Sequence, residues 1–234
     1  MVDLRRFELP TPTMRMWCAP SCATSPYSRI ILPQKIFVKK YLAFPNAALY
    51  NDRNHQLGVT FMEMIFLDDQ GKQQYYEALL QLCKKSDNEF VPPLSQRNST
   101  TQGNLTGGMN SGILAYFQEV MKQSVLVCTE NDRLLGFVSF REDYIPEHYP
   151  NAKLPNIYVS TLILSADSRG RGLTKQIYQH LFMERFPERS IYTRTWSTNA
   201  AHLKILSFFC FSQCMCIPNH RGEGIDTVYY ELKR

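Results

Sequence analysis

A short segment rich in glycine and arginine is the part of this chain best suited to bind an anion. It reads Arg-Gly-Arg-Gly-Leu-Thr-Lys over residues 169–175 and follows the apolar run Ile157–Leu164. A helix-patterned stretch, Leu173–Arg185, comes next, so the glycines stand where a strand turns into a helix. Glycines let the backbone approach a bound group closely, and the unpaired N–H groups of a first helical turn attract phosphate oxygens.

The spacing of this segment excludes two common phosphate-binding motifs. The chain has neither Gly-x-x-x-x-Gly-Lys-Ser/Thr nor an early Gly-x-Gly-x-x-Gly followed by an acidic residue for a ribose. The segment instead resembles the acyl-CoA loop of the GNAT family of N-acetyltransferases, which reads Arg or Gln, two residues, Gly, one residue, then Gly or Ala. Arg169 and Gly172 match, and Thr174 occupies the last place. Taken alone, such a loop can also be a solvated turn.

A second segment, residues 196–211, is similar to the family's strand-to-helix segment that ends in a Gly-Phe pair. Asn199 matches the Asn that commonly contacts the cofactor, although an Asn near a helix start is also a frequent N-cap. Two positions depart from the family. Leu206 stands where many members carry a Tyr that protonates the leaving thiolate, and Cys210 replaces the usual Gly.

The order of expected elements also fits the family. Hydrophobic periodicity predicts strands at 59–67, 124–128, 134–140, 157–164, 190–195 and 226–232, and helices at 72–84, 113–121, 173–185 and 198–209. The first two helices should bury Tyr76, Leu79, Leu80 and Cys83, and Ile113, Leu114, Phe117 and Met121. Asn131-Asp132 is the turn of a hairpin. The resemblance spans residues 58–234 and implies an α/β fold with a mixed, mostly antiparallel central sheet flanked by helices.

The resemblance implies an acyl-CoA-dependent N-acetyltransferase that passes an acetyl group from acetyl-CoA directly to an amine in a ternary complex. Such a reaction needs an amine that loses its proton, a donor for the developing oxyanion and a stabilised leaving thiolate. In the family the central strand and the next one splay apart, which frees backbone groups for the pantetheine arm. The implied cofactor-binding residues are Leu162, Ile163, Leu164, Arg169, Gly170, Arg171, Gly172, Leu173, Thr174, Lys175 and Asn199.

The sequence does not single out one group that accepts the proton. Tyr158 stands where some members place a Glu early on the central strand, but its ordinary pKa near 10 makes it a poor base, and packing against the sheet is the alternative. Glu142 is a second catalytic candidate, and Ser207 is a weak replacement for the missing Tyr.

Four carboxylates suggest an entrance for the acceptor between the loop after Phe140 and the turn 219–226. Glu142, Asp143, Glu223 and Asp226 would give this entrance a negative potential suited to an ammonium group. The alternative is that they are separate, solvated loop carboxylates that never converge.

Charge divides the chain into two parts. Residues 1–57 hold 8 Lys and Arg against 3 Asp and Glu, and residues 58–234 hold 18 of each, so the net charge of +5 belongs to the first part. This basic extension also contains 6 of the 13 prolines, which makes it poorly ordered in large part and argues against an amphipathic transit peptide. A neutral domain at 58–234 gives no case for nucleic-acid binding, and no apolar run is long enough to span a membrane.

Seven cysteines raise the question of a metal site. Cys210, Cys214 and Cys216 are close in sequence, but His220 does not complete a zinc-finger spacing, so we expect buried thiols in a reducing cytoplasm and no metal. His202 is expected to be a surface or half-buried residue, with a catalytic role as the alternative.

Two other function classes stay open. A non-catalytic acyl-CoA-binding regulatory module would keep the phosphate loop and lose the proton-transfer groups, and Leu206 favours it. An interaction protein would use the basic extension to hold a partner. The acceptor cannot be read from the sequence, since a small amine, an antibiotic, a peptide N-terminus and a lysine are all compatible, and the oligomeric state is equally open.

Overall fold

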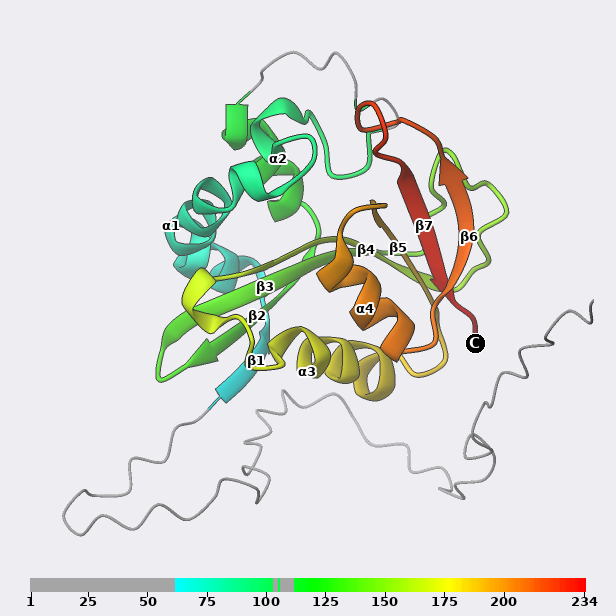
Figure 1. Ribbon diagram of the computed structural model, residues 1–234. Helices are drawn as coiled ribbons and strands as arrows, with labels where there is room; N and C mark the ends of the chain where they lie inside the picture. Colours follow the sequence, from blue (N-terminus) through cyan, green and yellow to red (C-terminus); the bar gives the residue numbers. More distant parts are fainter. Residues whose placement is uncertain (1–61, 103–104, 106–111) are drawn as a thin grey trace, which may run out of the picture. The chain divides into compact units, whose positions relative to one another are not determined.

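The computed structural model describes residues 62–102, 105 and 112–234, which are coloured in Figure 1. The predicted extension 1–57 and the first three residues of the predicted strand 59–67 lie outside the described residues. Within the described part, the predicted α/β fold with a mixed, mostly antiparallel sheet is confirmed.

Seven strands form one sheet in the order β1-β2-β3-β4-β5-β7-β6, in which β4 and β5 are parallel and the other neighbours antiparallel. The strands are β1 (Met62–Phe66), β2 (Ser124–Glu130), β3 (Arg133–Glu142), β4 (Asn156–Leu164), β5 (Ser190–Trp196), β6 (Ser212–Ile217) and β7 (Thr227–Leu232). The helices are α1 (Asp69–Lys85), α2 (Gly112–Met121), α3 (Leu173–Gln179) and α4 (Ala200–Phe208). Short helical turns lie at Asp87–Glu89, Leu94–Gln96 and Ala166–Ser168, and a π-helical turn, His180–Arg185, continues α3.

Helices cover both faces of the sheet, with α1 and α2 on one face and α3 and α4 on the other (Figure 1). Successive side chains of a strand point to opposite faces, so Val125 and Val127 of β2 pack with α1 and α2, whereas Leu126 and Cys128 pack with α3 and α4. Because both faces are covered, β2 is apolar at four consecutive positions, 125–128, rather than at every second one.

The apolar faces of the first two helices differ from the prediction at two positions. Tyr76 is 38% exposed and Leu114 is 50% exposed, whereas Tyr116 and Val120 are fully buried. In α2 the buried stripe runs through Tyr116, Phe117 and Val120, the usual one-and-four spacing of a helix face. The predicted face was therefore wrong at Leu114, because an apolar side chain does not by itself tell whether a helix position is buried.

The hairpin of β2 and β3 turns where the sequence predicts it. Asn131 and Asp132 have φ angles of 50° and 63°, the left-handed conformation that a two-residue type I′ turn needs at both positions. Short polar side chains tolerate this conformation better than others, which explains why the dipeptide is found here.

Strand β6 is the element that the sequence does not predict. It is an edge strand whose residues are exposed or half-buried, and its register with β7 shifts between Gln213 and Met215. Without a buried face the strand lacks a clear period of two. Cys216 and Cys210 are exposed, so the expectation that the cysteines are buried holds for Cys83 and Cys128 but is wrong for these two.

Candidate active site

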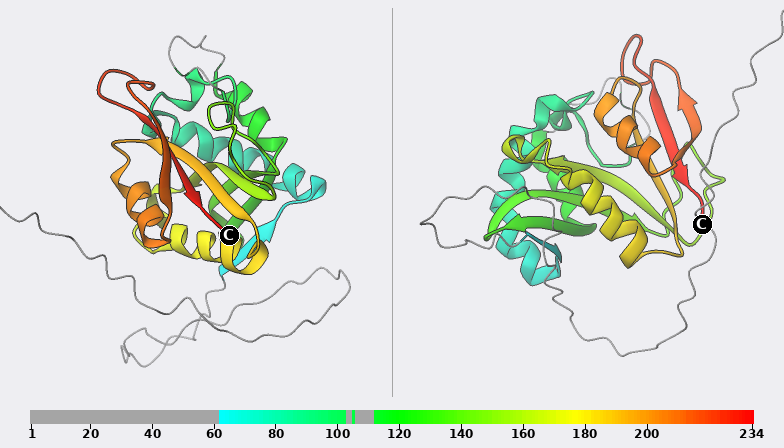
Figure 2. Two further views of the ribbon diagram at one scale, coloured as in Figure 1. Left: turned by 90° about the vertical axis from the view of Figure 1, so that its right-hand side faces the viewer. Right: turned by 60° about the horizontal axis from the view of Figure 1, so that its bottom comes forward.

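A cleft opens where β4 and β5 part. The two strands pair in parallel from Asn156 and Ser190 as far as Val159 and Thr193, after which β4 pairs with β3 alone and β5 with β7 alone. Figure 2 shows β6 and β7 turned away from β2 and β3 on either side of this opening. The cleft encloses about 710 Å³ and is lined by the second half of β4, the glycine loop, the end of β5 and the start of α4.

The open edge of β4 presents backbone groups to this cleft at alternate residues. The carbonyl oxygen of Ile163 lies beside Gly136 of β3, at 2.5 Å from the position that a Cβ of Gly136 would take, so Ile163 directs its backbone groups toward β3. In an antiparallel pair the next residues direct theirs to the other side. Leu162 and Leu164 therefore face the cleft with their backbone, whereas Ile163 does not.

The glycine loop closes one end of the cleft and leaves the space in front of it open. Gly170 and Gly172 have φ angles of 75° and 77°, which L side chains rarely adopt, and a Cβ on either would meet nothing within 4 Å. Gly172 precedes α3 and offers no side-chain cap to its first turn. The loop thus combines free backbone donors with unfilled space, which fits a pyrophosphate group.

The cationic side chains of the loop are engaged with neighbours. Arg169 forms a salt bridge with Glu89 at 2.6 Å and donates to the carbonyl oxygen of Leu164 at 3.0 Å. Arg171 is bound to Glu130, whose pKa this bond lowers, and its side chain does not line the cleft. Lys175 lies over the ring of Phe208, with 3.8 Å between Nζ and the ring centroid.

Asn199 lines the cleft and also caps α4. Its side-chain oxygen accepts the His202 N–H at 3.2 Å, and its Nδ2 donates to Oγ1 of Thr195 at 3.0 Å. The N-cap alternative is thus realised, and one N–H of the amide is left for any further contact.

A hydrogen-bonded pair, the buried Tyr178 and the half-buried His202, lies in the wall of the cleft and was not predicted as a pair. The Tyr178 hydroxyl and Nε2 of His202 are 2.7 Å apart. Burial raises the pKa of Tyr178 and lowers that of His202 to about 4, so both side chains are neutral at pH 7. His202 is half-buried, as expected. The helical spacing of Tyr178 indicates only a core position, so the sequence carries no signal for this pair.

Two positions that the sequence singles out for catalysis lie outside the cleft. Leu206 is fully buried in the core between α3, α4 and the sheet, so a Tyr there would replace core volume. Tyr158 is 1% exposed, packs against Tyr144 with ring centroids 5.0 Å apart, and has a pKa that burial raises further. Its packing alternative is the one that the structure realises.

The four carboxylates of the predicted acceptor entrance do not converge. Because β3 is antiparallel to β4, Glu142 lies opposite Ile157, at the beginning of β4. Arg189 forms salt bridges with both carboxylates at this end of the sheet, at 2.9 Å from Asp143 and 3.5 Å from Glu142.

Asp226 lies at the other end of β5, where its carbonyl oxygen accepts the N–H of Ser197 and its carboxylate accepts the N–H of Asn219. A predicted negative entrance that joins Glu142 to Asp226 is therefore wrong, and Glu142 does not line the cleft.

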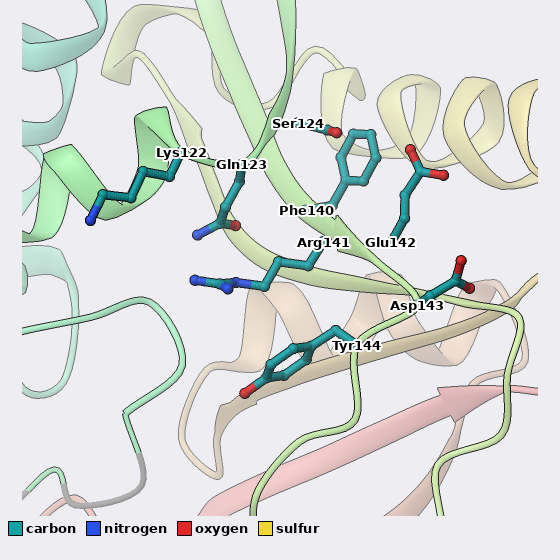
Figure 3. Close-up of a pocket in the computed structure, with 8 residues that line it drawn as sticks. All are labelled: Lys122, Gln123, Ser124, Phe140, Arg141, Glu142, Asp143 and Tyr144. Atoms are coloured by element: carbon teal, nitrogen blue, oxygen red, sulfur yellow. The ribbon is translucent and has the colours of Figure 1, made fainter.

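A second pocket of about 330 Å³ lies beside the end of β3 (Figure 3). Gln123, Arg141 and Tyr144 extend to one side of the strand in this view, and Glu142 points to the other. Gln123 accepts a hydrogen bond from Ser160, which lines the larger cleft, so the two cavities share a polar wall.

Among residues 62–102, 105 and 112–234, no group of three or more His, Cys, Asp or Glu side chains is placed to hold a metal ion. Within the same residues, no helix has the length and apolar character needed to cross a bilayer.

Comparisons with solved structures agree with this architecture. An N-acetyltransferase from Staphylococcus aureus Mu50 superposes with a TM-score of 0.52 at 18% identity, covering 74% of this chain and 98% of that one. The yncA protein of Salmonella typhimurium, solved with its cofactor acetyl-CoA, gives 0.50 at 17% identity, with 74% and 93% covered. A ribosomal-protein-alanine N-acetyltransferase from Brucella melitensis gives 0.50 at 13%, with 73% and 99% covered.

These identities establish a common fold and nothing narrower. No curated protein matches the chain significantly. The family model of the acetyltransferase (GNAT) family matches residues 103–209, a range that contains β2 to β5, the glycine loop and α4. Residues 103–209 of the chain therefore match the acetyltransferase (GNAT) family.

Proposed function

We propose that this protein transfers an acetyl group from acetyl-CoA to an amine acceptor in a ternary complex. The observation that carries the proposal is the cleft between β4 and β5, which runs from an unobstructed glycine loop along an unpaired strand edge. Acetyl-CoA supplies an activated thioester when it is bound. The family match and the fold support acetyl transfer in general, and the amine acceptor is part of the proposal.

The binding roles follow from the position of each group. The backbone N–H groups from Gly170 to Lys175 bind the pyrophosphate, and the backbone of Leu162 and Leu164 binds the pantetheine arm. Arg169 supports the loop rather than the ligand, because its guanidinium already links Glu89 to the carbonyl oxygen of Leu164. Asn199 orients the start of α4 and contributes its remaining N–H.

Catalysis in this cleft depends mainly on alignment and on neutral hydrogen-bond donors. Glu89 is the one carboxylate among the described residues that line the cleft, and it is paired with Arg169. We therefore assign no general base. Tyr178 holds a proton at its hydroxyl next to His202 and is the candidate donor toward the leaving sulfur. Holding two reactants in line can by itself lower a barrier by about 7–11 kcal/mol.

The loop assignment is tested with a pair of glycine variants. Gly172→Ala adds a Cβ to the open space in front of the loop and should weaken CoA binding, measured by calorimetry, by about tenfold or more. Gly112→Ala is the matched control, because Gly112 has a φ of 75° and equally free surroundings but lies at the start of α2. Equal CoA affinity of a folded Gly172→Ala variant and the parent would refute the loop assignment.

A non-catalytic acyl-CoA-binding module is the second candidate, and the lack of an available carboxylate in the cleft favours it. Both candidates bind CoA. Only the enzyme releases free thiol from acetyl-CoA when amines are added, so a thiol assay over a panel of amines separates them.

A further inference from the structure

Three arginines from distant parts of the sequence lie near one another, and one of them, Arg194, lines the cleft. Arg97 follows the turn Leu94–Gln96, Arg194 belongs to β5, and Arg221 lies in the turn between β6 and β7. Arg97 is 5% exposed and Arg221 7%. Burial, followed by repulsion from the other two arginines, lowers the pKa of Arg221 to about 9. Arg97 and Arg221 are thus buried cations, which are costly unless an anion compensates them.

The bonds of Arg194 and Arg221 go to neutral oxygens. Arg194 donates to the carbonyl oxygens of Gln102 at 2.8 Å and Thr100 at 3.2 Å. Arg221 donates to Oγ1 of Thr227 at 2.9 Å and to the carbonyl oxygen of Val91. Among the described residues, no carboxylate forms a salt bridge with Arg194 or Arg221. The fold therefore holds their positive charge in place and does not neutralise it.

One of these arginines lines the cleft, and the other two contact aromatic rings that line it. Arg194 lines the cleft directly, as do the rings of Phe90 and Trp196, whose centroids are 5.8 Å apart. The Arg221 guanidinium lies 5.6 Å from the centroid of Trp196, and that of Arg97 lies 5.4 Å from the centroid of Phe90.

Arg194, Arg221, Phe90 and Trp196 form what we call the arginine wall. This wall and the α3/α4 side of the cleft lie on opposite faces of the sheet. Thr195 of β5 bonds Asn199 at the start of α4, so the next side chains along the strand, Arg194 and Trp196, point to the other face. A ligand on the glycine loop and a ligand on this wall would meet where β4 and β5 part.

We infer that the acceptor amine also carries an oxyanion, a carboxylate or a phosphate group, which Arg194 and Arg221 bind beside the Phe90 and Trp196 rings. This inference rests on the proposed acetyl transfer and names the substrate class of the same cleft. A guanidinium offers planar, paired donors that match either oxyanion, and an anion here would offset a charge that the protein leaves uncompensated. The inference is the opposite of the expectation that Glu142 and Asp226 attract the ammonium group of the acceptor.

Matched acceptors test the inference with the full chain. Phenylalanine is compared with phenethylamine, and O-phosphoethanolamine with ethanolamine, by release of free thiol from acetyl-CoA. We expect kcat/KM for at least one oxyanion-bearing amine to exceed that of its partner without the oxyanion by about tenfold or more, since losing one side of a buried charge pair costs that much or more. The pair with the larger ratio tells whether the oxyanion is a carboxylate or a phosphate.

Variants of the arginines assign the preference to this wall. Arg221→Gln and Arg194→Gln should raise KM for the anionic acceptor about tenfold and leave KM for acetyl-CoA nearly unchanged, and Arg221→Lys should restore part of the preference. Arg185→Gln removes an exposed arginine that does not line the cleft and should change neither KM.

A measurement without turnover covers the case in which a glutamine variant folds poorly. Benzoate should raise the melting temperature of the parent more than benzamide does at equal ionic strength, and Arg221→Lys should retain most of this difference. Amines without an oxyanion that react as well as those that carry one, or variants that keep the full preference, would overturn the inference and leave the acetyl transfer standing. Failure to bind acetyl-CoA would instead remove the proposed function, and this inference with it.

Discussion

The Tyr178 hydroxyl is a proton-bearing side-chain group in the wall of the cleft, next to His202 of α4. Tyr178→Phe should lower kcat by about tenfold or more and leave KM for acetyl-CoA almost unchanged, because the ring is kept and only the donor is lost. Tyr230→Phe removes an exposed hydroxyl outside the cleft and serves as the control in the same steady-state assay. An unaltered kcat in Tyr178→Phe would show that the leaving sulfur takes its proton from water.

His202 should make the stability of the protein depend on pH. Its pKa is about 4 in the folded chain, because burial disfavours the charged form, and 6.5 without this burial. Between these values the unfolded chain binds the extra proton, so this contribution to stability is complete above about pH 6.5 and is lost as the pH falls toward 4. Urea unfolding at several pH values should show a flatter dependence in His202→Gln, and an identical slope in both proteins would contradict the assignment.

The residues of the glycine loop could be found from the sequence, whereas the arginine wall could not. The loop is a local pattern, and seven consecutive residues carry its whole signal. Arg97, Arg194 and Arg221 become neighbours only through the pairing of β5 with β7 and the packing of the segment after α1. In the sequence, each of these arginines taken alone would be expected to be a solvated surface charge. The contact between Tyr178 and His202 was missed for the same reason, since 24 residues separate them.

At the scale of elements, the close contact between β3 and β4 depends on Gly136. A Cβ at this position would come within 2.5 Å of the carbonyl oxygen of Ile163 and 2.4 Å of the side chain of Leu164. Gly136→Ala should therefore lower the free energy of unfolding by about 1–3 kcal/mol, because a backbone atom cannot yield as a side chain can.

The double variant Gly136→Ala with Leu164→Ala separates the two clashes in urea unfolding. It relieves the side-chain contact only, so truncating Leu164 should rescue little of the stability lost through Gly136→Ala. A full rescue would show that Leu164, and not the backbone of β4, sets the limit.

Elements with a buried face were predictable, and those without one were not. Strand β4 has eight of its nine residues buried or in contact with a core cluster, and its predicted range 157–164 agrees with the structure to within one residue. Strand β6 is exposed along much of its length and has a register shift, so its stability comes from pairing with β7. Backbone pairing of this kind leaves little trace in the hydrophobic pattern.

At the scale of the whole molecule, the described residues bury their hydrophobic clusters among themselves. All three clusters are formed by residues between Met62 and Leu232. A chain of residues 58–234 should therefore fold and bind acetyl-CoA with a Kd within about threefold of the full chain, as measured by calorimetry. A fragment that is insoluble or does not bind acetyl-CoA would show that the preceding residues complete the domain. The boundary near residue 57 and a cytoplasmic location stay predictions.

Net charge is a poor guide to the charge that a ligand meets in this molecule. Residues 58–234 hold equal numbers of acidic and basic residues, which suggests no preference for an anion or a cation. Pairing distributes these charges unevenly. The loop arginines Arg169 and Arg171 are neutralised by Glu89 and Glu130, while Arg194 and Arg221 bond neutral oxygens. The local field at the cleft therefore follows from salt-bridge partners and not from composition.

The parting of β4 from β5 also affects how fast backbone amides exchange with solvent. In most sheets the central strand holds the slowest amide hydrogens, because neighbours bond it on both sides. Here the amides of Leu162 and Leu164 lie near the middle of a seven-stranded sheet and yet face an open cleft. They should exchange deuterium like those of an edge strand in the free protein. A ligand seated along β4 would slow these two amides selectively, which turns the centre of the sheet into a reporter of occupancy.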